Sequence, residues 1–394
     1  MNLPTSYLRR MAAAAVVLLA LAACTYDDPE PAPSPSSSTQ GPTDALDRSM
    51  VAFMDQGAVA VITEIRWPGG TYSKAYGVRD LGTRVAAQPD DLVSVASVTK
   101  SMTAVSVLKL VEDGLIGLDD PVNGVVDSFT TVLQPPGPIT VRQLLNHTSG
   151  MPEFQAANEK TSDDVPRLLG ERLSVQRQLE LTASLPWEAR HVGSFRYSDS
   201  NYVVLGQLIE KLRGKPYPRV ILEDIISPLG LESTFLEWDL RQDPKLVHGY
   251  VTYRGERFDV TGSPPETGSS AFGAVSNVPD VNDFFAGLFT GKLLSAASLR
   301  EMTTTDPFPL YGLGLRRWSQ GCDGDYRFGG RGGFWAYRTT ALSSTDGKYQ
   351  ATMTLVPPPI PTSLEEPESE NRLDLWDDQM ESALQEALDR LCPN

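Results

Sequence analysis

The sequence predicts an α+β protein with an antiparallel sheet built from both ends of the folded chain. Three observations carry this prediction. Strand-like segments occur early and late in the sequence, helix-like segments fill the middle, and an amphipathic helix closes the chain. Strands segregated from helices, without a regular alternation of the two, are typical of α+β folds. We therefore expect a sheet flanked by helices, with a mainly helical inserted region.

The strands are identified by their β-branched and aromatic residues and by the turns between them. The predicted strands are 58–65, 71–78, 326–328, 337–343 and 349–355. Pro68-Gly69-Gly70 separates the first two, and Asp346-Gly347 is a tight hairpin turn between the last two.

Helices are predicted where apolar residues recur every three or four positions. They are 97–113, 201–213, 220–226, 280–288 and a final helix with Met380, Leu384, Leu388 and Leu391 on one stripe. Gly114 and Gly214 end the first two helices, because glycine readily adopts the left-handed conformation that stops a helix.

Composition and charge exclude several kinds of function. The 394 residues are 41% apolar and 21% charged, as in ordinary globular proteins, and the formal net charge is −16. A chain this acidic lacks the basic surface that nucleic-acid binding requires, so we expect no nucleic-acid partner. Three His and three Cys lie far apart, without the spacing of a zinc site. We expect neither a metal nor any other cofactor.

Residues 1–23 are predicted to be an export signal. Arg9 and Arg10 precede an apolar run, 11–23, which is too short to span ~30 Å of hydrocarbon but suits a signal-peptide core. The run ends in LAAC (21–24), which resembles the lipobox of bacterial lipoproteins. The resemblance implies that Cys24 is lipidated and anchors an extracytoplasmic protein to the bacterial cell membrane. A plain signal peptide with an incidental cysteine is the alternative.

A linker and a single domain follow the signal. Residues 24–44 are rich in Pro, Ser and acidic residues and have little to bury, so we expect a solvated tether. Residues 45–394 are the predicted folded domain, which we expect to be monomeric. The lipid anchor is then its sole expected contact with the membrane, because no later stretch is long and apolar enough to span it.

We expect the catalytic nucleophile and its base in the motif Ser97-Val98-Thr99-Lys100. Residues three apart share one face of a helix, so Lys100 can take the proton of Ser97, whose hydroxyl is a poor nucleophile without a base. In the first helical turn, free N–H groups and the helix dipole also favour a developing oxyanion at Ser97. By itself this motif is a weak signal, and a capping Ser beside a solvated Lys is the alternative.

Longer stretches around this motif resemble the serine β-lactamase and D-alanyl-D-alanine peptidase superfamily. Its class C β-lactamase and Streptomyces-type carboxypeptidase branch is the most similar. The matching segments are VSVASVTKSMTAVSVLKLVEDG (93–114), ITVRQLLNHTSGMP (139–152), YSDSNYVVLG (197–206) and YGLGL (311–315). Several motifs in order are more specific than any one of them, and the resemblance covers about residues 45–394. It implies a β-lactamase/DD-peptidase-like fold and an exported serine hydrolase.

The resemblance implies a role for each matching residue. Ser97 is the nucleophile that forms an acyl-enzyme, and Lys100 is its base or proton relay. Tyr197 passes protons to the leaving group and from the incoming water. A phenol near two cationic groups would have a lowered pKa, which suits this exchange. His147, in the second matching segment, is structural in the family.

Asp199 departs from the family, whose Tyr-Ser-Asn motif ends in Asn. Asn donates and accepts hydrogen bonds, whereas an ionised Asp accepts alone. Asp199 also adds negative charge where a substrate carboxylate would lie, or it pairs with Lys100 and weakens Lys100 as a base. We expect Asp199 to contact substrate, and we expect an esterase or peptidase rather than an efficient β-lactamase.

The third motif is a second departure. The family has Lys-Thr-Gly or His-x-Gly on a strand beside the site, and the matching stretch here is FGGRGG (328–333). One register places Gly330 at the position of the cation. A shift of one residue places Arg331 there, where it could grip a substrate carboxylate, followed by Gly332. The alternative is a flexible loop with Arg331 in solvent. The N–H of Gly333 is the expected second oxyanion-hole donor.

Cys322 and Cys392 remain once Cys24 is lipidated. Disulfides persist in exported proteins. One cysteine precedes the third-motif strand, and the other ends the final helix, which should pack on that sheet. We predict that the two are bonded to each other, with two buried free thiols as the alternative.

Two function classes stay open. The first is an exported serine hydrolase, D-alanyl-D-alanine carboxypeptidase-like or esterase-like, acting on a small molecule or a peptidoglycan peptide. The second is a non-catalytic cell-wall binding protein with the penicillin-binding fold. The missing His or Lys of the third motif favours the second class, whereas the intact Ser97, Lys100 and Tyr197 favour the first.

Overall fold

The computed structural model describes residue 41 and residues 43–170, 172–236, 243–261, 269–322 and 324–392. The predicted signal peptide and nearly all of the predicted linker lie outside these residues, so the lipidation of Cys24 stays a prediction. Within the described ranges, no helix is long and apolar enough to cross a membrane.

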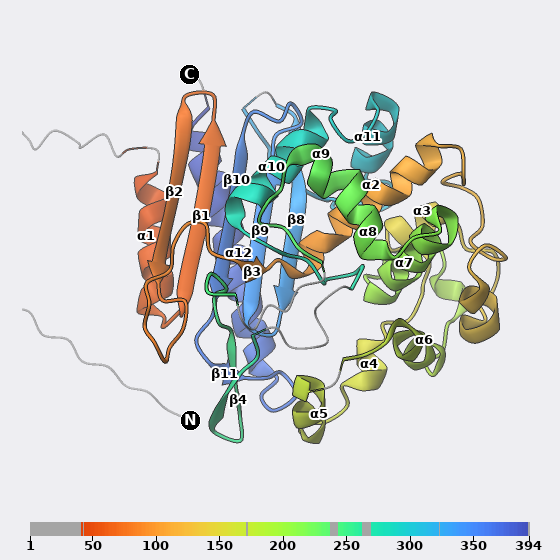
Figure 1. The fold of residues 1–394 in the computed structure, drawn as a ribbon, viewed down its shortest axis with the longest axis horizontal. Coiled ribbons are helices and arrows are strands. Elements are labelled where there is room, and N and C mark those ends of the chain that lie inside the picture. The colour runs from red at the N-terminus through yellow and green to blue at the C-terminus, as the bar shows by residue number, and fades with distance from the viewer. Residues whose placement is uncertain are drawn as a thin grey trace, which may run out of the picture. The chain divides into compact units, whose positions relative to one another are not determined.

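One six-stranded sheet, in the order β2-β1-β10-β9-β8-β7, organises the described residues (Figure 1). Its strands are β1 (Ala60–Trp67), β2 (Gly70–Gly77), β7 (Arg316–Gln320), β8 (Tyr326–Phe334), β9 (Tyr337–Ser343) and β10 (Gln350–Val356). Neighbouring strands are antiparallel throughout, and β1 pairs with β10. This pairing joins the N-terminal hairpin to the C-terminal strands, which confirms the predicted α+β arrangement with a sheet from both chain ends.

Two small sheets lie beside the main one. They consist of β11 (Ile360–Pro361), β4 (Tyr250–Tyr253) and β5 (Glu256–Asp259), and of β3 (Val93–Ser94) and β6 (Val275–Ser276). The pairing of β3 with β6 matters for the site. β3 leads directly into the turn that carries Ser97, and β6 follows closely after Ala271, so the pair fixes two segments that meet at Lys100.

Helices fill the middle of the described chain and cover the sheet. The α-helices are α1 (Asp44–Asp55), α2 (Thr99–Glu112), α3 (Val141–Leu145), α4 (Gln155–Asn158), α5 (Val165–Gly170), α6 (Val175–Ala183), α7 (Asp199–Arg213), α8 (Tyr217–Ile221), α9 (Ser227–Leu229), α10 (Val278–Phe289), α11 (Ala296–Thr303) and α12 (Glu368–Arg390). The predicted helix at 220–226 is instead the end of α8 followed by a π-helical turn, Leu222–Ile226.

The helices α1 and α12 cover one face of the sheet. Their apolar residues, such as Phe53 and Met380, share a buried cluster with Val61 of β1 and Met353 of β10. Met380, Leu384 and Leu388 of the predicted stripe are all buried. At about 1.5–3 kcal/mol for each large side chain removed from water, this packing is a main source of stability for the two chain ends.

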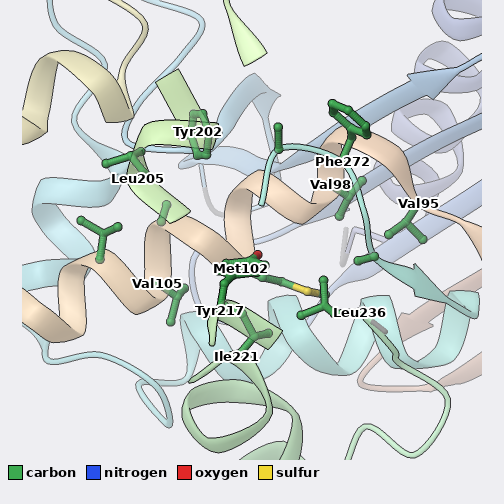
Figure 2. Packing of buried hydrophobic residues seen from close by; sticks show 14 of the residues in the cluster. Val95, Val98, Met102, Val105, Tyr202, Leu205, Tyr217, Ile221, Leu236 and Phe272 are labelled. Carbon is green, nitrogen blue, oxygen red and sulfur yellow. The ribbon is translucent and has the colours of Figure 1, made fainter. Parts of the chain in front are cut away.

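The helix α2 is the buried centre of the other side. All of its residues from Thr99 to Leu108 are buried, and a helix that is buried all round belongs to the core of a protein. Figure 2 shows Met102 and Val105 of α2 among Tyr217 and Ile221 of α8, within one buried cluster. A helix packed on all sides gives the residues at its N-terminal end fixed positions.

A disulfide joins Cys322 to Cys392, as predicted from the sequence. It links the chain between β7 and β8 to the C-terminal end of α12, across a sequence separation of 70 residues. The bond therefore holds α12 against the edge of the sheet.

Replacement of both Cys322 and Cys392 by Ser should lower the free energy of unfolding by roughly 3–5 kcal/mol, because a bond that closes a long loop restricts the unfolded chain. Thermal unfolding of the protein without its signal peptide measures this change. Wild-type protein unfolded with a reductant serves as the control and should match the variant. Equal melting temperatures for oxidised wild type and the variant would contradict the prediction.

Candidate active site

Ser97 lies in a single 3₁₀ turn, Ala96–Val98, that leads directly into α2. The sequence predicted Ser97 as the first residue of that helix, and the structure moves the start to Thr99. Ala96 has a positive φ of 46°. Residues other than glycine adopt such a conformation at a cost of about 1–3 kcal/mol, and these strained positions gather at functional sites. The turn and the buried helix together fix the Ser97 hydroxyl.

Lys100 is buried directly beside Ser97, with 1% of its surface exposed. Its Nζ donates hydrogen bonds to Ser97 Oγ over 2.9 Å and to the carbonyl of Ala271 over 2.8 Å. The same Nζ lies 2.6 Å from Asp199 Oδ1. A buried ammonium is stable when it is paired and hydrogen bonded, and Lys100 has two hydrogen-bond acceptors and one ion-pair partner.

Tyr197 meets the other two predicted catalytic residues. Its hydroxyl shares a hydrogen bond with Ser97, and Lys100 Nζ lies 5.0 Å from the centre of its ring. Tyr197 is 44% exposed, and it borders both of the cavities that meet at Ser97. The structure thus brings Ser97, Lys100 and Tyr197 together at one point.

The expected lowering of the Tyr197 pKa is wrong. Desolvation of its hydroxyl and the negative charge of Asp199 raise the pKa of Tyr197 well above its ordinary value of 10.0. The expectation assumed two nearby cations. Lys100 is paired with Asp199, and the second cation is missing because residue 330 is glycine. At neutral pH, Tyr197 is therefore an uncharged phenol that can donate a proton.

His147 packs against the ring of Tyr197, in line with its expected structural role. His147 is completely buried, and the centre of its ring lies 4.3 Å from that of Tyr197. Its Nδ1 accepts a hydrogen bond from the backbone N–H of Ser198 over 3.2 Å. Burial and the charge of Lys100 lower the pKa of His147 well below 6.5. A neutral, buried imidazole in this place orients the phenol.

Glu153 is a functional residue that sequence reasoning missed. Its Oε2 accepts a hydrogen bond from the backbone N–H of Asp199. Burial and the charge of Asp199 raise the pKa of Glu153 to about 8. The carboxyl groups of Glu153 and Asp199 therefore lie close together near Lys100. Asp199 pairs with Lys100, and Glu153 holds a proton at neutral pH.

The structure decides the register of the third motif. A Cβ atom at Gly330 would lie 3.3 Å from the side chain of Val98, and one at Gly332 would lie 3.0 Å from the backbone N of Ser97. Gly330 and Gly332 therefore face the nucleophile, and Gly330 takes the position of the family's cation. The run is also part of β8, which continues to Phe334, so the flexible-loop alternative is wrong.

The prediction that Arg331 binds a substrate carboxylate is wrong. Arg331 lies on the opposite face of β8, where α12 packs. Its guanidinium contacts four carboxylates of that helix, at distances of 2.9–3.5 Å, from Asp374, Asp377, Asp378 and Glu381. The alternative in which Arg331 points to solvent is also wrong. Arg331 ties the strand to α12 and has no donor left for a substrate.

Two cavities meet at Ser97. The first, of about 250 Å³, is called the aromatic cavity because Phe272, Phe334 and Trp335 line it. The rings of Phe272 and Phe334 are stacked, with their centres 5.4 Å apart. Glu159 also lines this cavity, and burial with the charge of Glu370 raises its pKa to about 7.

The second cavity, of about 530 Å³, is called the arginine cavity because Arg316, Arg331 and Arg338 line it. Ser97 and Gly333 border both cavities. Both residues therefore border the space that an acyl oxygen would occupy, which an oxyanion hole at these two positions requires. Asp199 borders the aromatic cavity but not the arginine cavity, and its Oδ1 pairs with Lys100 rather than being open to substrate.

Three residues at the site could not be identified from any motif in the sequence. Ala271 offers a carbonyl oxygen, which any residue can supply. Glu153 directly follows the matching segment 139–152 and is the one that a search for carboxylates near the motifs could have found. Arg338 follows the third motif on the next strand, and its place in the lining of both cavities depends on the pairing of β8 with β9.

Comparisons with known proteins agree with this geometry. The chain is similar to protein flp of Staphylococcus aureus (strain MW2), with 28% identity over 198 residues. That match covers 49% of this chain and 37% of flp, so the chain spans well under two thirds of this relative.

Two solved structures are similar over most of the chain. A D-stereospecific amidohydrolase from Streptomyces sp. superposes with a TM-score of 0.67 and 26% identity, covering 83% of this chain and 97% of that one. A D-amino acid amidase from Ochrobactrum anthropi SV3 superposes with a TM-score of 0.72 and 22% identity, covering 89% and 98%. The second likeness shows a shared fold.

A family model described as Beta-lactamase matches residues 46–353, well over half of the chain. The match begins in α1 and ends in β10, so it includes both halves of the sheet and the residues gathered around Ser97. The members of this family are serine hydrolases. The chain therefore belongs to the β-lactamase family.

Proposed function

We propose that this protein hydrolyses an amide or ester through an acyl-enzyme at Ser97, as a D-alanyl-D-alanine carboxypeptidase-like or esterase-like enzyme. The observation that carries the proposal is the hydrogen bonding of Ser97 Oγ to both Lys100 and Tyr197. A nucleophile in contact with two proton-transfer groups is the arrangement that acyl transfer needs. The likeness to a D-stereospecific amidohydrolase supports a substrate of this kind.

The steps follow from the geometry. Ser97 Oγ attacks the acyl carbon while its proton passes to Lys100, and the negative charge moves to the acyl oxygen between the N–H groups of Ser97 and Gly333. Tyr197, which is uncharged, donates a proton to the leaving group as the tetrahedral intermediate collapses. Water then attacks the acyl-enzyme by the reverse of these proton transfers and frees Ser97.

Asp199 limits the first of these steps. Lys100 accepts the Ser97 proton when its amine is uncharged, whereas the resting site holds it as the ammonium partner of Asp199 at 2.6 Å. An Asn in this place would leave Lys100 without the ion pair. We infer that the protein is slower at neutral pH than a relative with the unaltered motif.

A non-catalytic cell-wall binding role is the second candidate. The pairing of Lys100 with Asp199 and the glycine at position 330 favour it, because both weaken the acid–base and substrate-binding sets. Covalent reaction at Ser97 separates the two candidates, since a binding protein would not be acylated. Export, lipid anchoring at Cys24 and a monomeric state remain parts of the proposal.

Incubation with benzylpenicillin should add the mass of one penicillin to the wild-type protein and none to Ser97→Ala. Intact-mass spectrometry at times from seconds to hours detects this adduct. Hydrolysis of p-nitrophenyl acetate, compared between the same two proteins, covers the case of an esterase that penicillin does not acylate. No adduct and no Ser97-dependent hydrolysis would favour the binding role.

Asp199→Asn should raise kcat/KM at pH 7 by roughly tenfold, because loss of a close ion pair worth about 1–2 kcal/mol releases Lys100 to act as a base. The measurement is the rate of ester hydrolysis at pH 7. Asp119→Asn, at an exposed position, is the matched control. A fall in activity would show instead that Asp199 is needed to position Lys100.

Glu153→Gln should change how stability depends on pH. Burial lets the folded protein hold the Glu153 proton up to about pH 8. Its contribution to stability is therefore complete below the unfolded pKa of 4.5 and is lost as the pH rises through about 8. The variant should be more stable than wild type at pH 9, by about 1–3 kcal/mol.

Thermal unfolding of wild type and Glu153→Gln between pH 4.5 and 9 tests this expectation. Glu180→Gln, on the surface helix α6, controls for the loss of a negative charge. Parallel curves for wild type and Glu153→Gln would show that Glu153 is ionised throughout this range.

A further inference from the structure

A smaller recess adjoins the aromatic cavity, and we call it the inner recess. The residues that line both spaces are Gln155, Glu159, Leu168, Phe272, Phe334 and Trp335. The inner recess has a volume of about 20 Å³, which is room for one group of the size of a water molecule. Ser97 lines the aromatic cavity but not the inner recess. An acyl group attached to Ser97 would therefore extend through the aromatic cavity towards the recess.

Two hydrogen-bond acceptors that line the inner recess have no donor. Gln178 is 5% exposed, and its Oε1 has no partner within the described residues. Its Nε2 donates a hydrogen bond to the carbonyl of Leu173 over 3.2 Å, which fixes the amide group. The carboxyl group of Glu159 also receives no hydrogen bond in the described part of the chain. Buried acceptors without a donor are costly, so the recess favours a ligand that brings N–H groups.

The charges around the inner recess favour a cation. Glu159 lines both spaces, and Glu370 lines the aromatic cavity. Burial and the negative charges of Glu370 and Asp199 raise the pKa of Glu159 to about 7. A bound ammonium would reverse this shift, because a nearby cation favours the ionised carboxylate.

Two of the described arginines border these spaces, and neither forms an ion pair with Glu159. Arg167 lines the inner recess, where it donates hydrogen bonds to the side chain and the carbonyl of Asn158 over 2.9 and 2.7 Å. Arg338 lines the aromatic cavity but not the recess. The positive charge that Glu159 lacks is therefore one that a ligand can supply.

The aromatic wall suits an ammonium and an apolar stem. Phe334 stacks on both Phe272 and Trp335, with ring centres 5.4 and 5.8 Å apart, and the face of an aromatic ring attracts a cation. Trp335 has a positive φ of 42°, in the turn between β8 and β9. Glycine would adopt this conformation without strain, whereas a tryptophan adopts it at a cost. A strained tryptophan in the wall of both spaces points to ligand binding.

We propose that the inner recess binds a protonated amine at the far end of the substrate's acyl group, with Glu159 as its counter-ion. Resting on the proposed function, this inference names the substrate class as an ester or amide of an amino acid in which an apolar stem separates the amine from the carbonyl. The bond between the acyl carbon and the leaving group breaks, the leaving group takes one proton, and water supplies the hydroxyl of the new acid. The ammonium in the recess stays unchanged.

Binding to the Ser97→Ala variant tests the inference without turnover. The ligands are 6-aminohexanamide and 4-aminobutanamide, titrated by NMR at pH 8 beside heptanamide and pentanamide, in which a methyl group replaces the ammonium. At least one amine should bind fivefold or more tightly than its uncharged analogue. Glu159→Gln should abolish this preference, whereas Glu386→Gln, at an exposed position near the other end of α12, should retain it. Equal binding of amine and analogue at both lengths, or an unchanged preference in Glu159→Gln, would overturn the inference.

The preference for the amine should be greater at pH 8 than at pH 6. The Glu159 carboxyl group, with a pKa of about 7, loses its proton over this range, while a primary amine stays charged. The other charged groups that act on Glu159 are Glu370, Asp199, Asp164 and Arg167. Glu159→Gln should bind both ligands equally at the two pH values, and a pH dependence that survives in this variant would contradict the role of Glu159.

Trp335→Gly is a second variant, chosen because it should fold at least as well as the wild type. Glycine relieves the strain of the positive φ and removes the ring, so the melting temperature should be kept or raised while the preference for the amine falls. A preference that is unchanged in the folded variant would count against the inference.

Turnover by the protein with Ser97 intact separates this inference from the proposed function. The substrates are the p-nitrophenyl esters of 6-aminohexanoic acid and heptanoic acid. A higher kcat/KM for the amino ester, lost in Glu159→Gln, supports both the hydrolase and the role of Glu159. If Ser97 hydrolyses neither ester, the proposed function fails for these substrates, and the binding preference still decides whether Glu159 recognises an amine.

Discussion

The close approach of β8 to the turn that carries Ser97 is the constraint on which the site depends. A Cβ atom at Gly332 would lie 2.2 Å from the carbonyl oxygen of Val95, so no side chain fits between strand and turn. The sheet edge and the nucleophile are therefore packed as one unit. β7 pairs with β8 as far as Gly329, and the next part of that edge borders the two cavities. The oxyanion donors and the cavities all follow from this contact.

Charge balance is the second constraint. Each buried charge near Ser97 needs a partner, because an unpaired charge in the interior is costly. Lys100 is paired with Asp199, so Glu153 keeps its proton, and the negative surroundings hold Tyr197 in its uncharged form. On the far side of β8, the carboxylates of α12 engage Arg331 completely and Arg338 weakly.

Much of this architecture could be predicted because local sequence patterns determine it. The strand and helix periods indicated the sheet, and the spacing of Ser97 and Lys100 predicted that their side chains meet. The errors concern relations through space. The role of Arg331 depends on carboxylates that α12 brings from elsewhere in the chain, and the protonation of Tyr197 depends on Asp199 and Glu153 together. Neither of these contacts between distant residues can be predicted from one segment of the sequence.

The pairing of β1 with β10 also has a consequence for the order of folding. Thr63 of β1 donates a hydrogen bond to the carbonyl of Thr352, a residue 289 positions later in the chain. Contacts between such distant residues form slowly, because a long loop must close first. The edge of β1 that faces away from β2 therefore stays unpaired until nearly the whole chain has been made. Until β10 pairs with β1, that edge is open to pairing with another chain.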